Sequence, residues 1–235
     1  MPFIFDPLYL LLTVPALIFT LWAQWRVKST FNKYSQMGVA SGMTGAEAAA
    51  AVMRAGKVTG VGIERHQGFL SDHYDPRARM LRLSPEVYDG RSVSSIAVAA
   101  HEAGHSIQDA VGYGPLILRS KLVPVTNIGS RLWFWPFMIG MLLTQMGPAI
   151  GQTLVLVGIG LFCAVVLFQI VTLPTEFDAS NRAKLVLAQS GIVTTQEEAI
   201  GVTKVLNAAA MTYVAAAAAS VMQLIYLILR SRSRD

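Results

Sequence analysis

Four apolar stretches alternate with polar segments along this chain of 235 residues. The stretches cover roughly residues 7–25, 130–146, 150–173 and 208–229. Each approaches the length of about 20 residues that an α-helix needs to cross the hydrocarbon core of a bilayer. A short Gly-Pro-Ala segment at 147–149 joins the second stretch to the third, so we expect these two to form a helical hairpin. The pattern predicts a mostly α-helical membrane protein with about four transmembrane helices.

The polar region between the first and second stretches predicts a small α+β domain. Thr44 and Glu47 form a T-x-x-E capping pattern at the start of an alanine-rich helix that ends near residue 55. Short β-prone segments at 58–63, 68–74 and 79–84 fit a short β-sheet, with a turn near residues 75–77. A further helix is expected from about 92 to 111, and its apolar part is far too short to cross a membrane.

These patterns divide the chain into five segments. We predict an N-terminal transmembrane helix at 1–28, a polar domain at 29–122, a transmembrane hairpin at 123–173, a second polar segment at 174–207, and a C-terminal transmembrane helix with a basic tail at 208–235. Pro174 and Thr175 are expected to start a helix in the second polar segment. Glu197 and Glu198 are interpreted as a solvated or helix N-terminal pair.

The composition supports a membrane protein and narrows the possible chemistry. Hydrophobic residues make up 53% of the chain and charged residues 14%, against about 25% charged in ordinary soluble domains. The only cysteine, Cys163, excludes a disulfide within a monomer and a zinc site built from cysteines. The net charge of +5 is spread over the polar segments without a nucleic-acid-binding motif. We therefore expect contact with a lipid bilayer and no nucleic-acid partner.

The distribution of basic residues predicts the orientation in the membrane. Of the 19 lysines and arginines, 16 lie in residues 26–131 and 174–207, which a two-span hairpin places on one side of the bilayer. Because cytoplasmic loops carry an excess of Lys and Arg, both segments are expected to be cytoplasmic. The three arginines of the C-terminal tail oppose this arrangement, unless the fourth stretch does not cross completely.

Residues 101–105 have the sequence H-E-A-G-H, an H-E-x-x-H motif on the helix predicted at 92–111. His101 and His105 are four positions apart, so both lie on one helix face and can bind one Zn²⁺. Glu102 then lies beside the open coordination position, where it can accept a proton from a metal-bound water. The motif therefore predicts zinc-dependent peptide hydrolysis with Glu102 as the general base. The alternative is a helix with two surface histidines and a solvated glutamate.

A catalytic zinc site usually has a third protein ligand. The extended motif H-E-x-x-H-x-x-G-x-x-H is excluded, because Gln108 and Val111 occupy its Gly and His positions. A carboxylate on a later helix is the other common solution, and we favour Glu176, which the hairpin returns to the side of the motif, with Asp178 as the alternative ligand. Asp178 is otherwise expected to pair with Arg182 or to orient a ligand. Both carboxylates could instead only compensate the dipole of a helix N-terminus.

His73 precedes the turn near residue 75 and is a candidate catalytic residue. A histidine close to the metal could stabilise the oxyanion that forms when water attacks a carbonyl. The alternative is a strand-end histidine that is hydrogen-bonded to a backbone carbonyl. An exposed strand edge within residues 69–83 could hold the substrate as an added strand.

The combination of motifs resembles the YugP-like membrane zinc metallopeptidases of bacteria. The matching segments are residues 72–76 (D-H-Y-D-P), 81–84 (L-R-L-S), 99–105 (A-A-H-E-A-G-H) with Gln108, and 173–180 (L-P-T-E-F-D-A-S). The layout is also similar to the HtpX-like membrane gluzincins, whose third zinc ligand is the glutamate of an E-x-x-A-D pattern. Glu176 and Ala179 match that pattern, whereas Ser180 replaces its aspartate. This departure keeps Asp178 open as the ligand.

The resemblance implies a zinc-dependent peptidase embedded in the bacterial cell (inner) membrane, with a zincin-like polar domain. Its substrates would be proteins or peptides, and a homo-oligomer or a membrane-protein partner is compatible with it. In this arrangement the metal ligands would be oriented by hydrogen bonds from residues that do not touch the metal, namely Asp178, Ser180 and Arg182.

Two other functions remain open at this point. A site-2-type intramembrane protease also uses H-E-x-x-H but places the motif within a membrane span, together with an aspartate from another span. A non-catalytic membrane scaffold or chaperone could keep zinc for structural reasons, in which case four protein ligands are expected.

Overall fold

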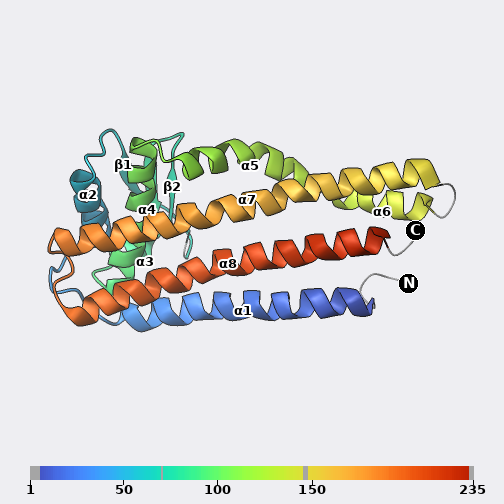
Figure 1. Ribbon diagram of the computed structural model, residues 1–235. Coiled ribbons are helices and arrows are strands. Elements are labelled where there is room, and N and C mark those ends of the chain that lie inside the picture. The colour runs from blue at the N-terminus through green and yellow to red at the C-terminus, as the bar shows by residue number, and fades with distance from the viewer. Residues whose placement is uncertain (1–5, 70, 145–147, 233–235) are drawn as a thin grey trace. The chain divides into compact units, whose positions relative to one another are not determined.

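The computed structural model describes residues 6–69, 71–144 and 148–232, and this part of the chain is mostly helical (Figure 1). Leu70 of the second predicted strand, the start of the predicted turn at 147–149 and the end of the basic tail lie outside the described residues. The elements in chain order are α1 (Pro7–Ser35), α2 (Gly45–Ala55), β1 (Gly62–Arg65), β2 (His73–Asp75), β3 (Met80–Leu83), α3 (Pro85–Tyr88), α4 (Val93–Ala110), α5 (Gly114–Leu132), α6 (Phe134–Leu143), α7 (Pro148–Gln189) and α8 (Gln196–Arg232).

The chain forms two compact units, each made of several segments. The apolar unit contains residues 1–22, 118–173 and 213–235, and the polar unit contains residues 23–117 and 174–212. The long helices α1, α7 and α8 each contribute residues to both units. The polar unit combines the predicted polar domain with the predicted second polar segment, which are far apart in the sequence.

Among the described residues, three helices are long and apolar enough to cross a membrane, namely α1, α7 and α8. The second predicted span lies instead on α6, a 10-residue apolar helix that follows α5. Pro136 has no backbone N–H, so it cannot continue the helical hydrogen bonding from Leu132. This accounts for the interruption at Trp133, so that α6 starts later than the predicted span.

The α6–α7 pair of the apolar unit depends on glycines at its contact. A Cβ atom placed on Gly140 would lie only 2.6 Å from the carbonyl oxygen of Gly151, and one on Gly158 would lie 2.7 Å from Cβ of Phe137. Small residues of this kind allow helix backbones to approach closely in membranes. Apolar side chains surround the contact: Phe137, Met141, Val155, Phe162, Val166, Tyr226 and Leu227.

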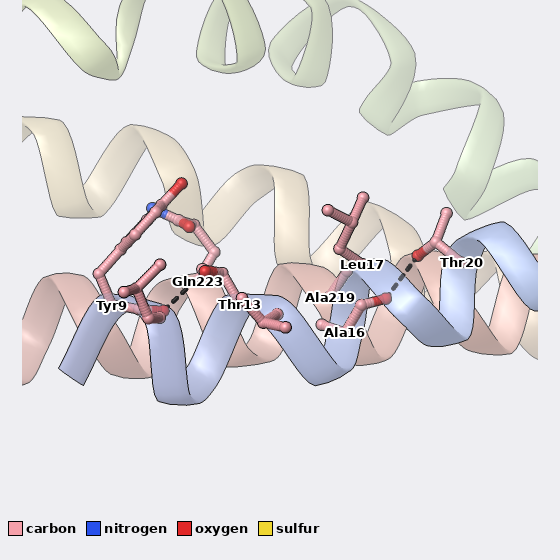
Figure 2. Close-up of a pocket in the computed structure, with 9 residues that line it drawn as sticks. Tyr9, Thr13, Ala16, Leu17, Thr20, Ala219 and Gln223 are labelled. Carbon is pink, nitrogen blue, oxygen red and sulfur yellow. Dashed lines mark hydrogen bonds between the residues drawn. The ribbon is translucent and has the colours of Figure 1, made fainter. Parts of the chain in front are cut away.

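A cavity of about 400 Å³ lies between α1 and α8 in the apolar unit (Figure 2). Its lining includes Thr13 and Thr20 from α1 and Gln223 from α8. The two threonine hydroxyls donate to carbonyls one turn earlier in α1, at 2.6 and 2.9 Å, as Figure 2 shows. These hydroxyls are therefore satisfied within their own helix, and they leave a mostly apolar surface.

Helix α7 does not start at Pro174, so the prediction of a helix start there was wrong. The helix runs without interruption from Pro148 to Gln189 and contains Pro174 in its interior. Proline in a helix interior removes one hydrogen bond, but helices of membrane proteins tolerate this because neighbouring groups satisfy the freed carbonyl. The predicted polar segment is thus the end of α7, a turn, and the first part of α8.

The polar unit contains a three-stranded sheet with the strand order β1-β3-β2. β1 pairs with β3 in parallel and β2 pairs with β3 in antiparallel fashion, so β2 is an edge strand. Leu81 and Leu83 alternate with half-buried residues along β3 and are fully buried. One face of the short sheet therefore belongs to the core.

Helix α4 is the centre of this core and buries 15 of its 18 residues. Ser92 caps its N-terminus by accepting a hydrogen bond from the N–H of Ser95. α2 packs beside it, and the predicted capping box of α2 is confirmed, since Thr44 and Glu47 each bond the other's backbone N–H. Burial of α4 brings the H-E-x-x-H motif into the interior.

Candidate metal centre

Three buried side chains of the polar unit lie close enough together to bind one metal ion: His101 and His105 from α4 and Glu176 from α7. We call this group the ligand cluster. Nε2 of His101 lies 3.1 Å from Oε2 of Glu176, and Nε2 of His105 lies 3.5 Å from the same oxygen. All three candidate ligand atoms lie within 4.8 Å of one another.

The donor set and spacing of the ligand cluster fit zinc. Zinc binds imidazole nitrogen and carboxylate oxygen at about 2.0–2.2 Å, so two ligand atoms at a tetrahedral angle are about 3.3 Å apart. The observed separations of 3.1 and 3.5 Å bracket that distance. Glu176 therefore already lies at the separation from each histidine that a shared Zn²⁺ requires.

Close packing of α4 on α7 produces this spacing. A Cβ atom on Gly104, the fourth residue of the motif, would lie 2.7 Å from the carbonyl oxygen of Ala179. The absence of a side chain at 104 and the small one at 179 let the two backbones touch. Because His101 and His105 flank this contact on α4 and Glu176 lies one turn before it on α7, the contact brings the ligand cluster together.

The outer ring nitrogens of both histidines have partners. Nδ1 of His101 lies 3.1 Å from the hydroxyl of Ser180, and Nδ1 of His105 lies 2.9 Å from Oε1 of Gln108. With Nδ1 engaged on the outer side, each ring presents Nε2 to Glu176. Partners of this kind orient metal-binding histidines in proteins.

Asp178, the alternative third ligand, lies outside the ligand cluster. Its Oδ2 accepts hydrogen bonds from Nε2 of Gln108 at 2.8 Å and from Nε of Arg182 at 2.6 Å. The guanidinium of Arg182 also lies 5.7 Å from the ring centroid of Tyr113. The predicted pair of Asp178 with Arg182 is therefore present.

Glu102 is buried next to the ligand cluster and is held by the edge strand. The backbone N–H of Tyr74 in β2 donates to Oε2 of Glu102 at 3.1 Å. The hydroxyl of Tyr74 donates to Asp109, further along α4, at 2.8 Å. Two bonds from one residue thus fix β2 against the helix that carries the motif.

The charge of the cluster favours an ionised Glu176. Burial by itself would raise the pKa of Glu176, but the hydrogen bonds and positive charge of His101 and His105 hold it well below the ordinary value. Burial likewise opposes protonation of His105, yet the hydrogen bond and negative charge of Glu176 raise the pKa of His105. A buried carboxylate that stays negative is suited to bind a cation.

His73 lies at the start of β2 with two local contacts. Its Nδ1 lies 2.8 Å from the carbonyl oxygen of Ser71, and its ring stacks edge-on against His66 at 5.5 Å. Neither contact joins His73 to the ligand cluster. Its role as an oxyanion-stabilising residue stays a prediction, and the bond to Ser71 is the one expected of a strand-end histidine.

Comparison with known proteins identifies the family. A family described as "Putative neutral zinc metallopeptidase" matches residues 9–232. The chain belongs to this family. It is 46% identical over 222 residues to a protein of Bacillus subtilis (strain 168) named "Putative membrane protease YugP", and the match covers 94% of this chain and 96% of that relative. No solved structure matches the chain.

Membership of the family confirms the resemblance expected from the motifs and the predicted cofactor. The family is one of zinc peptidases, and the ligand cluster gives this chain a group of three side chains that can hold the ion. The relative is named a membrane protease, and in the part of this chain that the structure describes three helices are long and apolar enough to cross a membrane.

Two residues of the polar unit make long-range contacts that sequence reasoning did not predict. Gln108 was noted only within a motif, but it is fully buried and connects His105 to α7. For Glu198 the interpretation as part of a helix N-terminal pair is confirmed, since Glu197 and Glu198 lie in the first turn of α8. The solvated alternative is wrong for Glu198, which is only 2% exposed and accepts the N–H of Ala40. The spacing of Thr195 and Glu198 repeats the T-x-x-E pattern and could have indicated the local part of this arrangement.

Proposed function

We propose that this protein is a membrane-embedded zinc metallopeptidase in which His101, His105 and Glu176 bind the metal and Glu102 acts as the general base. The observation that carries the proposal is the ligand cluster on α4 and α7, with Glu102 next to it in the sequence and buried beside it. The donors are those of a gluzincin-type site, two histidines of H-E-x-x-H and a glutamate of a later helix.

The side chains divide the chemistry between them. When bound, Zn²⁺ supplies Lewis acidity, which lowers the pKa of water to about 7 and polarises the peptide carbonyl. The carboxylate of Glu102 accepts the proton of the attacking water and then delivers it to the leaving amine. The bond from the Tyr74 N–H holds that carboxylate in one orientation, so that little reorganisation is needed during proton transfer.

The edge of β2 that does not pair with β3 is the surface that we propose binds the peptide. Tyr74 lies opposite Leu81 of β3, but its N–H donates to Glu102 and therefore points away from β3. The unpaired side of β2 consequently faces the general base. An extended peptide that adds to this edge would have its backbone alongside Glu102 and would pair with backbone groups of β2 other than the Tyr74 N–H, which donates to Glu102.

The site geometry favours this function over the two alternatives. Within the described ranges, the group of possible metal ligands has three members, whereas a structural zinc site is usually closed by four. The motif helix α4 has 18 residues, and it is not one of the three apolar helices that could cross a membrane. A site-2-type protease would require the motif within a span.

We propose that the protein lies in the bacterial inner membrane with the polar unit in the cytoplasm. The support is the concentration of lysines and arginines in residues 26–131 and 174–207. On this assignment α1, α7 and α8 cross the bilayer, and α6 enters it without the length of a full span. The zincin-like character of the polar unit belongs to the same proposal.

Removal and return of the metal tests the proposal. A chelator should abolish cleavage of unfolded casein by the purified, detergent-solubilised protein, and added zinc should restore it, because the helices that carry the ligands remain folded. Helicity should be measured by circular dichroism in the same samples. Protein that never cleaves casein, yet loses its helices when zinc is removed, would support the scaffold alternative and contradict the peptidase.

A further inference from the structure

Gln108 is a fully buried amide on α4 that the chemistry above does not use. It lies three residues after His105, and its Oε1 is 2.9 Å from Nδ1 of that histidine. Its amide nitrogen is 2.8 Å from the carbonyl oxygen of Thr175 and 2.8 Å from Oδ2 of Asp178, both on α7. One side chain therefore touches a predicted metal ligand and two groups of the helix that carries the third ligand.

The partners of Gln108 allow only one orientation of its amide. A backbone carbonyl and an aspartate carboxylate accept hydrogen bonds, so the NH₂ group must face Thr175 and Asp178. The amide oxygen must then face His105, and an oxygen acceptor requires a proton on Nδ1. In the neutral imidazole that binds a metal, this arrangement leaves the lone pair on Nε2, the nitrogen that lies 3.5 Å from Glu176.

Residues further from the ligand cluster hold the amide of Gln108 in this orientation. Asp178 is held by Arg182 at 2.6 Å, and Arg182 lies over the ring of Tyr113. The acceptor for Gln108 is thus fixed on α7 rather than free to rotate. These hydrogen bonds therefore make the tautomer of His105 depend on the position of α7, the helix that carries Glu176.

We propose that Gln108 is a positioning residue for His105. By accepting a hydrogen bond from Nδ1 it makes Nε2 the nitrogen that faces the metal, and by donating to α7 it makes this choice depend on the position of that helix. The proposal rests on the proposed function only in that a metal binds His105 and Glu176. Ser180, the partner of His101, provides an informative contrast. Its hydroxyl can donate or accept, so it does not dictate which ring nitrogen carries the proton.

The test combines zinc affinity with a signal from His105 itself. Gln108→Met keeps the length of the side chain and removes both polar functions. Gln108→Glu keeps an acceptor for Nδ1 of His105 but replaces the NH₂ group that donates to Thr175 and Asp178. Zinc affinity is measured by competition with a chelator. The imidazole N–H protons are observed by NMR in zinc-loaded protein with ¹⁵N-labelled histidine, which has four histidines to assign.

We expect Gln108→Met to bind zinc about 10–100-fold more weakly, the range seen when partners of metal-binding histidines are removed. The Nδ1–H proton of His105 should lose its hydrogen-bonded shift and exchange faster with water, whereas Gln108→Glu should keep that signal. Ser180→Ala should weaken zinc binding less than Gln108→Met. Ser106→Ala is the matched control, because Ser106 is buried on the same helix and its hydroxyl bonds only Ala103 in its own helix, at 2.7 Å.

A Gln108→Met protein with zinc affinity within about twofold of wild type and an unchanged His105 proton signal would overturn the proposal. If that variant does not fold, Gln108→Glu decides the question, since loss of the signal there contradicts a positioning role. None of these readouts uses peptide hydrolysis. A protein that shows the expected effects but cleaves no peptide would refute the proposed function and leave the role of Gln108 intact.

Discussion

The contact between Gly104 and Ala179 should be the most sensitive point of the metal centre. In Gly104→Ala the new Cβ would lie 2.7 Å from the carbonyl oxygen of Ala179, whereas ordinary contacts of a Cβ atom begin at 3.4 Å. The obstructing atom belongs to the backbone and cannot rotate away. α4 and α7 must therefore separate by roughly 0.7 Å, the difference between these two distances.

A helix separation of this size should disrupt metal binding much more than it destabilises the fold. Metal–ligand distances tolerate changes of only about 0.2 Å, so Glu176 would be drawn out of reach of an ion held by His101 and His105. Overpacking of this kind costs about 1–3 kcal/mol in stability. Replacement of glycine by alanine within a helix stabilises the folded state by up to about 1 kcal/mol, which offsets part of this cost, so the variant should still fold.

The assay is zinc affinity by chelator competition, together with thermal unfolding of the metal-free protein. We expect Gly104→Ala to bind zinc at least 10–100-fold more weakly, with only a modest loss of thermal stability. Gly160→Ala on α7 is the control, because a Cβ there meets no atom within 4 Å, and its zinc affinity should not change. Wild-type zinc affinity in Gly104→Ala would refute the argument that this contact sets the ligand spacing.

Three further predictions concern the ligands and the core. Glu176→Gln should weaken zinc binding far more than Asp178→Asn, measured by chelator competition, and the reverse order would make Asp178 the ligand. Zinc at about 100 times its Kd should stabilise the wild type by about 2.7 kcal/mol in thermal or denaturant unfolding, and Glu176→Gln should lose most of this gain. Glu198→Gln should cost about 1–3 kcal/mol at pH 7. Burial opposes the charge of Glu198, but backbone N–H groups of Ala40, Thr194 and Thr195 lower its pKa below 4.5. The stabilisation is therefore complete above pH 4.5 and is lost as the pH falls, so the difference between wild type and variant should shrink in acid; a constant difference would contradict this assignment.

The sequence could indicate the ligand cluster because its members carry separate signals. His101 and His105 lie at helical spacing around a glutamate, and few carboxylates follow them. The hairpin topology then favoured Glu176, and the structure brings it to both histidines. These inferences depend on local spacing and on counting, which do not require knowledge of packing.

Properties that depend on packing could not be predicted in this way. The continuation of α7 through Pro174 depends on neighbouring segments that satisfy the freed backbone groups. The interruption near Trp133 turned a predicted span into the short helix α6. Gln108 has an ordinary helical position in the sequence, and only the approach of α7 gives its amide two acceptors.

Peptide hydrolysis and zinc content, measured on the same preparation of Glu102→Gln, test the central claim most directly. Glutamine preserves the size of the side chain but cannot accept the proton of water, and Glu102 is not a member of the ligand cluster. We predict that this variant binds one zinc per chain with wild-type affinity and cleaves no casein above background. Cleavage at the wild-type rate by the zinc-loaded variant would contradict the account.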